Sequence, residues 1–175
     1  MIGLSPLRAA FLFLITGLVP LTSPAVFAAS CDFESAGLCR ISIDDQLPSG
    51  KTFDISAEEE RLSNSNQSGN NDSGYWGNGG ATPDTRISKI SLEVDGIAFH
   101  IPEKSYSDLG NITALEIKEN QHAIVLVING GQSDSAYYAT FVFIDSALRK
   151  RTVRNKLHPG SLWEKTTYRE LKPRP

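Results

Sequence analysis

The chain has 175 residues and a formal net charge of −3, which suits one domain and is too little for two of ordinary size. Two cysteines are too few for a disulfide-dense scaffold or a cysteine-built zinc site, and three scattered histidines do not supply a histidine-based metal site. No repeat or heptad pattern is present, which excludes solenoids and coiled coils. The sequence predicts no metal and no cofactor.

Residues 1–28 have the layout of a secretory signal peptide. Arg8 supplies a positive start, Ala9 to Val19 an apolar core, and Val26-Phe27-Ala28 a cleavage site. The apolar stretch is shorter than the roughly twenty residues that a membrane-spanning helix needs. We therefore expect cleavage after Ala28 and export to the periplasm or the medium. The mature chain, residues 29–175, is then a single domain without a transmembrane anchor.

Cys31 and Cys39 lie close together near the start of this mature chain, in the segment CDFESAGLC. An exported chain with two nearby cysteines most simply pairs them, so we predict a disulfide clip within an N-terminal segment of residues 29–62. The alternative is a lipoprotein. The sequence before Cys31 loosely fits a cleavage box after which this cysteine would be acylated and anchor the chain to a membrane.

The segment 29–62 continues with two expected short strands, residues 40–44 and 51–55, on either side of a Pro-Ser-Gly turn. Ser56 to Glu60 then carries the chemistry of a helix start, a serine followed by acids. Residues 63–84 are rich in Asn, Ser and Gly and almost free of apolar side chains, which predicts a flexible loop. Tyr75 and Trp76 form its aromatic tip.

From residue 86 onward the pattern is that of antiparallel hairpins. Ile90, Leu92 and Val94 alternate with polar residues, Asp95-Gly96 is a two-residue turn signal, and Ile97, Phe99 and Ile101 alternate again. We expect these six apolar side chains to share one buried face and His100 to face solvent. Residues 102–109 are expected to form one or two helical turns, because Pro102 suits a first turn and Gly110 ends it.

The remaining chain predicts five more strands. They cover residues 113–118, 123–128, 136–144, 147–154 and 163–169. Residues 123–128 and 136–144 are apolar on both faces, so we expect them to be central strands with cover on both sides. A two-residue turn at Asp145-Ser146 would place Phe143 opposite Leu148, Phe141 opposite Lys150 and Tyr137 opposite Arg154.

The predicted fold is therefore mainly β, with residues 85–175 as an antiparallel core. We expect a small sandwich or a curved sheet built from hairpins, with at most one or two short helices. The alternative is an α+β layer in which residues 55–62 or 102–110 pack across the sheet as helix. The expected core comprises Ile90, Leu92, Phe99, Ile101, Leu115, Ile117, Leu126, Phe141 and Phe143.

The sequence carries no recognisable catalytic motif. It has neither a Gly-x-Ser-x-Gly elbow nor a phosphate-binding glycine loop, so we predict no enzyme activity and no nucleic-acid partner. Two alternatives stay open. One is a small hydrolase assembled from dispersed residues with His100 or His122 as its base, and the other is a purely structural envelope protein or lipoprotein.

Charge is the one global feature that points to a partner. Residues 30–145 carry 18 acidic and 7 basic side chains, whereas residues 146–175 carry 2 acidic and 9 basic ones. A basic group of this density attracts anionic partners, such as an envelope component or an acidic protein surface. We therefore predict a non-catalytic binding protein of the cell envelope. Its candidate binding residues are Arg149, Lys150, Arg151, Arg154, Tyr75 and Trp76.

Overall fold

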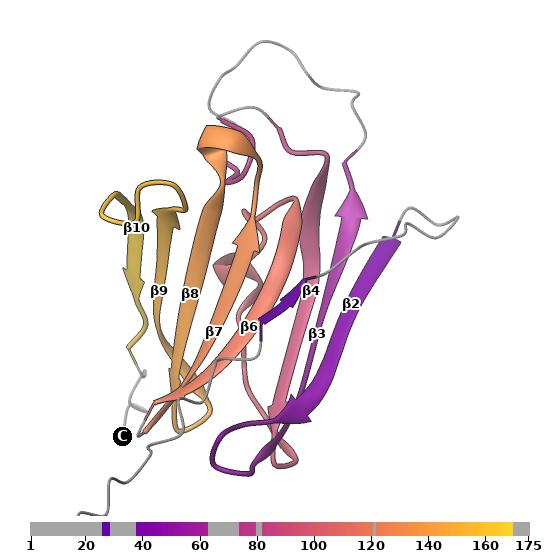
Figure 1. Ribbon diagram of the computed structural model, residues 1–175, viewed down its shortest axis with the longest axis vertical. Coiled ribbons are helices and arrows are strands. Elements are labelled where there is room, and N and C mark those ends of the chain that lie inside the picture. The colour runs from indigo at the N-terminus through magenta and orange to yellow at the C-terminus, as the bar shows by residue number, and fades with distance from the viewer. Residues whose placement is uncertain (1–25, 29–37, 63–73, 80–81, 121, 170–175) are drawn as a thin grey trace, which may run out of the picture.

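The computed structural model describes residues 26–28, 38–62, 74–79, 82–120 and 122–169, which form two antiparallel β-sheets, neither closed into a barrel (Figure 1). The mainly β prediction is confirmed. The smaller sheet contains, in spatial order, β2 (Leu38–Gln46), β3 (Thr52–Arg61), β4 (Thr85–Val94) and β5 (Ile97–Ala98). The larger sheet contains five strands flanked by a short sixth, in the order β1 (Val26–Ala28), β6 (Ile112–Asn120), β7 (Ala123–Gly130), β8 (Tyr137–Ile144), β9 (Ala147–Asn155) and β10 (Leu162–Thr167).

Two tight turns set the register of their hairpins. Asp95 and Gly96 have φ of 49° and 74°, and Asp145 and Ser146 have φ of 51° and 60°. Two successive residues with positive φ form the turn type whose twist matches antiparallel strands. Val94 consequently pairs with Ile97, and Ile144 with Ala147, as the sequence predicts.

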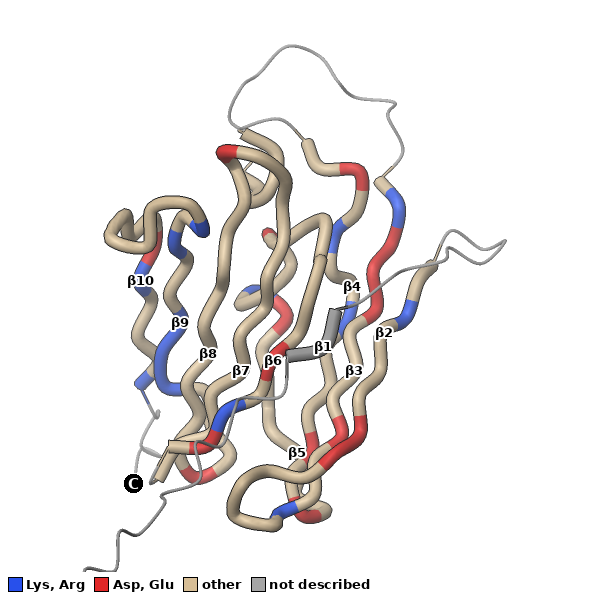
Figure 2. Tube along the Cα trace, viewed as in Figure 1, with Lys and Arg blue, Asp and Glu red and all other residues tan. Residues whose placement is uncertain are grey.

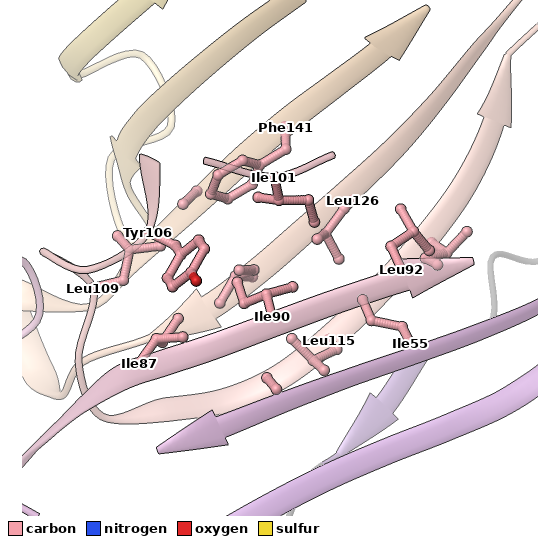
Figure 3. Close-up of a cluster of buried hydrophobic side chains, with 14 of the residues drawn as sticks. Ile55, Ile87, Ile90, Leu92, Ile101, Tyr106, Leu109, Leu115, Leu126 and Phe141 are labelled. Carbon is pink, nitrogen blue, oxygen red and sulfur yellow. The ribbon is translucent and has the colours of Figure 1, made fainter. Parts of the chain in front are cut away.

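One hydrophobic core lies between the two sheets (Figure 3). The larger sheet contributes Leu115, Leu126 and Phe141, all completely buried, and the smaller contributes Ile55 and Leu92. The expected core residues are confirmed except for Phe99, which is only half-buried. The core is not confined to residues 85–175, because Ile41, Phe53, Ile55 and Ala57 of β2 and β3 are also buried in it.

The hairpin of β4 and β5 differs from its prediction at two positions, since Phe99 is half-buried and Ile97 is exposed. The predicted face holds Ile90, Leu92, Val94 and Ile101, all buried, and His100 is exposed as expected. Ile97, however, is 57% exposed. It begins the two-residue strand β5 at the end of the smaller sheet, and both residues of this strand are exposed.

The expected helix start at Ser56 is wrong, because these residues belong to β3. Phe53, Ile55, Ala57 and Glu59 alternate inward, which is the period of a strand. Each acid of the run finds a partner on β4: Glu58 faces Lys89 at 3.9 Å, Glu59 accepts from Thr85, and Glu60 pairs with Arg86. Contacts with the neighbouring strand therefore determine that residues 56–60 form a strand, and they outweigh the local preference for a helix start.

Two short 3-10 turns, η2 (Glu103–Ser105) and η3 (Ser133–Ser135), are the helical elements of the described residues. The turn η2 confirms the helical turn expected after Pro102. The alternative, in which residues 102–110 pack across the sheet as a helix, is not observed. None of the described helices is long or apolar enough to cross a membrane.

The beginning of the chain bears on the leader and on the disulfide. Val26 to Ala28 pair with β6 in this uncleaved chain, so the end of the predicted signal peptide contacts the fold. Cleavage itself stays a prediction. Cys39 is buried on β2, whereas Cys31 lies outside the described residues, so the disulfide stays a prediction as well.

Candidate binding face

Strand β9 carries the predicted basic group, and a bulge divides that group between two faces. Phe143 pairs with Leu148 and Val142 with Lys150, so Arg149 is an extra residue on β9. Beyond this bulge Arg151 lies opposite Phe141. Because neighbours on a strand point to opposite faces, Arg151 faces the core and Lys150 faces outward.

The predicted register of β9 is correct only up to Leu148. We expected Lys150 opposite Phe141 and Arg154 opposite Tyr137, but the structure places Arg151 and Asn155 at these positions. A bulge shifts the pairing by one residue and so exchanges the inward and outward sets.

Arg151 is an internal structural cation. It is 3% exposed, and its Nη2 donates to both Asp108 carboxylate oxygens at 2.7 and 2.8 Å. Its Nη1 donates to both Glu164 carboxylate oxygens at 2.8 and 2.7 Å. The Nε atom is the one buried polar side-chain atom without a partner among the described residues. Two bidentate contacts neutralise this charge and leave none of it to attract an external anion.

Burial and the nearby Arg151 shift the pKa of the Asp108 carboxyl group in opposite directions. Burial raises the pKa of its carboxyl group, whereas the guanidinium of Arg151 lowers that pKa, and burial prevails. The same carboxylate accepts a hydrogen bond from Trp76 Nε1 at 3.1 Å. Asp108 therefore joins the loop before β4, the turn before β6 and strand β9.

Trp76 is held in place by a stacked partner. Its ring lies 5.5 Å from that of Trp163 on β10, with an interplanar angle of 12°, and its backbone N–H donates to Asp108 O at 2.8 Å. Gly77, at φ of 105°, approaches so closely that a Cβ there would lie 2.9 Å from Gly110 O. This part of the predicted flexible loop is anchored, while residues 63–73 and 80–81 lie outside the described residues.

Tyr75 and Trp76 do not form one aromatic tip. Tyr75 lies half-buried beside Arg86, where a hydrogen bond to Glu60 and a second one to Tyr75 raise the pKa of the guanidinium. Trp76 turns instead to Trp163 on the larger sheet. The two aromatic residues thus brace the loop against both sheets.

Three cations occupy the outward face of the β9–β10 hairpin, which we call the outer cationic face: Lys150, Arg154 and Lys165. Lys165 pairs with Thr152, which lies between Lys150 and Arg154 on the same face of β9. Both lysines are exposed and Arg154 is half-buried, and none of the three forms an ion pair with a described residue. Figure 2 shows these basic segments along β9 and β10.

Lys165 was missed by sequence reasoning. Its position depends on how β10 pairs with β9, and a second bulge at Trp163 sets that register. The alternation of the last strand was readable in the sequence, but its offset from β9 was not. Arg149 is the bulged residue of β9, and its carbonyl accepts a hydrogen bond from Tyr168 N–H at 2.9 Å.

Apolar and hydroxyl side chains continue the outer cationic face across the larger sheet. On β8, Tyr138 pairs with Arg154, Thr140 with Thr152 and Val142 with Lys150, and all three β8 side chains are half-buried. The expected cover on both sides of the central strands is not observed, since no described segment forms a layer over this side. The face therefore combines positive charge with moderately apolar surface.

The outward face of the smaller sheet has the opposite charge. Asp44 pairs with Asp54, and Asp54 pairs with Glu93, so three exposed carboxylates form one row across β2, β3 and β4. Figure 2 shows the acidic segments on these strands. No group of three or more His, Cys, Asp or Glu in the described part of the chain has the arrangement of a metal site.

A hollow of about 290 Å³ lies where several hairpin turns gather, away from β10. His122, Asp145 and Ser146 line it, together with Lys51 and Glu119, which form an ion pair at 2.6 Å. No hydrogen bond among the described residues joins His122 to the carboxylate or to the hydroxyl. The hollow brings together residue types that hydrolases use without the base–nucleophile contact that defines their sites.

Comparison with known proteins gives no relative. No protein-family model matches the chain, and neither a curated protein nor a solved structure is significantly similar to it.

Proposed function

We propose that this protein is exported after cleavage behind Ala28 and acts in the cell envelope as a non-catalytic binding protein for an anionic partner. The outer cationic face is the proposed contact surface. An anionic envelope component or an acidic protein surface has the chemistry that this face attracts.

The observation that carries the proposal is the absence of counter-charge on Lys150, Arg154 and Lys165. Arg151, one residue from Lys150, is enclosed by two carboxylates, whereas its outward neighbours form no ion pair with a described residue. Three cations brought together by strand pairing repel one another. An anionic partner would relieve that repulsion, and Tyr138 beside Arg154 offers apolar contact area.

Trp76 and Trp163 support this surface indirectly. Their stack ties β10 to the loop before β4, and β10 carries Lys165. We therefore assign the tryptophans to positioning the cationic hairpin and assign the direct contacts to the three cations.

The proposal is tested by capture of envelope components on the mature protein. We expect the variant K150E/K165E to lose a component that the wild type retains. The control variant K89E/K104E also replaces two lysines with glutamates, so it changes the net charge equally. Neither lysine lies on β9 or β10, and Lys89 loses only an exposed 3.9 Å ion pair with Glu58, so this variant should retain the component. If the wild type and both variants retain the component equally, the outer cationic face is not its binding surface.

Export is tested separately by mass spectrometry of the protein from envelope and medium fractions. Cleavage after Ala28 gives a chain beginning at Ala29, and the lipoprotein alternative gives an acylated chain beginning at Cys31. A chain that keeps Met1 and stays in the cytosol would contradict the proposal.

The hollow near His122 supports the competing hydrolase. If a hydrolytic activity were found, H122A should abolish it, and H100A would test the other candidate base. Hydrolysis lost in either variant, together with no captured partner, would favour the enzyme. No partner and no activity would favour a structural envelope protein.

A further inference from the structure

Strand β6 forms one edge of the larger sheet, and only part of that edge is covered. Its strand partner on the outer side, β1, spans three residues that pair with Ala114, Leu115 and Glu116. Among the described residues no strand pairs with this side of β6 beyond Glu116 (Figure 1). The rest of β6, from Ile117 to Asn120, therefore presents unpaired backbone groups outward.

The covering strand lies inside the predicted leader. Val26 to Ala28 are the last residues before the proposed cleavage point, so this inference rests on the proposed export. Cleavage would remove β1 and leave the outer side of β6, along its full length, without a strand partner from the described residues. An edge strand of this length that contains no proline is a template for pairing with another strand.

The charges on β6 favour a second copy of the same strand as that partner. Glu116 and Lys118 share the outward face of the larger sheet, since they pair with Val127 and Val125, which are both half-buried. Within one chain they already form an ion pair at 3.0 Å. Opposite charges two residues apart on one face can complement each other across a two-fold axis.

The possible two-fold registers differ in what they bring together. An antiparallel pair centred on Glu116 would place this carboxylate opposite its own copy, and a pair centred on Lys118 would do the same with two ammonium groups. Centring on Leu115 would pair Glu116 with Ala114. Centring on Ile117 instead places each Glu116 opposite Lys118 of the other copy, and directly opposed unlike charges stabilise a strand pair.

We propose that the mature chain forms a two-fold symmetric dimer through β6, with Ile117 on the axis and Glu116 of each copy facing Lys118 of the second copy. The pairing joins two five-stranded sheets into one continuous sheet. Each copy uses the same surface, so the contact is closed and does not extend into a fibre. In the uncleaved chain β1 occupies the same edge, so leader removal permits assembly.

A lysine on an edge strand ordinarily discourages pairing. Here its effect depends on register, because Lys118 repels a second copy centred on itself and attracts one centred on Ile117. The two charges therefore select one register, and their reversal gives a specific test.

The experiment measures the association of the processed protein by sedimentation equilibrium, for wild type and the single variants E116K and K118E. The N-terminus of each sample is read by mass spectrometry, and urea unfolding checks that each variant is folded. The E116K chain carries lysine at both positions, and the K118E chain carries glutamate at both. Each variant alone should dimerise at least about tenfold more weakly than wild type, and an equimolar mixture should recover a heterodimer.

Recovery on mixing is the expected result, because it requires the two positions to face each other across the axis. A monomeric wild-type protein that begins at Ala29 would overturn the dimer and leave the proposed export intact. A dimer unchanged by either reversal, or one not restored by mixing, would overturn the β6 register. A wild-type chain that retains Val26 to Ala28 would contradict the export on which the inference rests, and would overturn both.

Discussion

The two faces of β9 show how differently one run of basic residues can be used. Arg151 on the inner face is 3% exposed and is held by Asp108 and Glu164, whereas Lys150 on the outer face is exposed and has no ion-pair partner among the described residues. The bulge at Arg149 decides which residue takes which place. Consecutive basic residues in a sequence therefore need not form one surface. Here the inner cation lies in a buried ionic network, and the outer ones are those that we propose for binding.

The largest effect is expected when Arg151 loses both of its carboxylates. The double variant D108A/E164A leaves a buried cation without an ionic partner, and we expect a loss of about 3–5 kcal/mol in the free energy of unfolding. Urea denaturation measures it. The matched control E103A/D134A removes two exposed acids from the 3-10 turns and should change stability by less than about 1 kcal/mol. A similar result for both variants would show that the inner network is not structural.

The same contrast between faces applies to β7. Leu126 is completely buried, whereas its neighbour Val127 is half-buried on the outer face. L126A should cost about 2–5 kcal/mol, because it removes core contacts and leaves a cavity. V127A should cost clearly less by the same denaturation assay. Equal losses would show that the outer face is covered by a layer that we have not assigned.

The contact between Trp76 and Trp163 tests how the hairpin of β9 and β10 is held against the loop before β4. A double-mutant cycle with W76L, W163L and the double variant, measured by thermal or urea unfolding, isolates the contact between the two rings, because leucine cannot stack. The Trp76 Nε1–Asp108 hydrogen bond is lost in both W76L proteins and so cancels in the cycle. Because the rings are stacked at 5.5 Å, we expect a coupling energy of about 0.5–1.5 kcal/mol. If the losses in unfolding free energy of the two single variants simply add up in the double variant, the stack does not hold β10 in place.

The smallest effect is a pH dependence from the inner face of the smaller sheet. Burial raises the pKa of Glu59 above 4.5, and the hydrogen bonds from Ile112 N–H and Thr85 Oγ1 only partly oppose this. A raised native pKa means that the folded chain binds the proton more tightly than the unfolded chain. Stability from this group is therefore gained as the pH falls through the raised pKa and is complete below 4.5.

The variant E59Q isolates this contribution, because an amide oxygen accepts the same two hydrogen bonds and does not titrate. We expect the wild type to gain stability relative to E59Q as the pH is lowered from about 7 to about 5. A constant difference between the two proteins across this range would contradict the assignment.

Much of the fold was predictable from the sequence for a physical reason. Asp95-Gly96 and Asp145-Ser146 adopt the positive φ values that short side chains tolerate, and alternation then assigns Leu92 and Phe143 to the core. These signals are local, so one sequence is enough to read them.

The candidate site was less predictable, because bulges and distant partners determine it. The residues around Arg151 in the sequence do not predict that Asp108 and Glu164 will bind it. Those around Trp76 likewise do not predict that its ring will stack on Trp163. The helix start predicted for the acids at 58–60 is wrong for the same reason, because their partners lie on β4, far away in the sequence. Contacts between segments far apart in the chain decide each of these cases.

The central claim is that the bulge at Arg149 separates a buried, structural cation, Arg151, from a solvent-exposed one, Lys150, and one comparison tests it most directly. R151M and K150M differ by a single position and introduce the same side chain. By urea denaturation we predict a loss of about 3–5 kcal/mol for R151M and a change within about 0.5 kcal/mol for K150M. Equal losses, or a larger loss for K150M, would contradict the division of β9 into inner and outer cations.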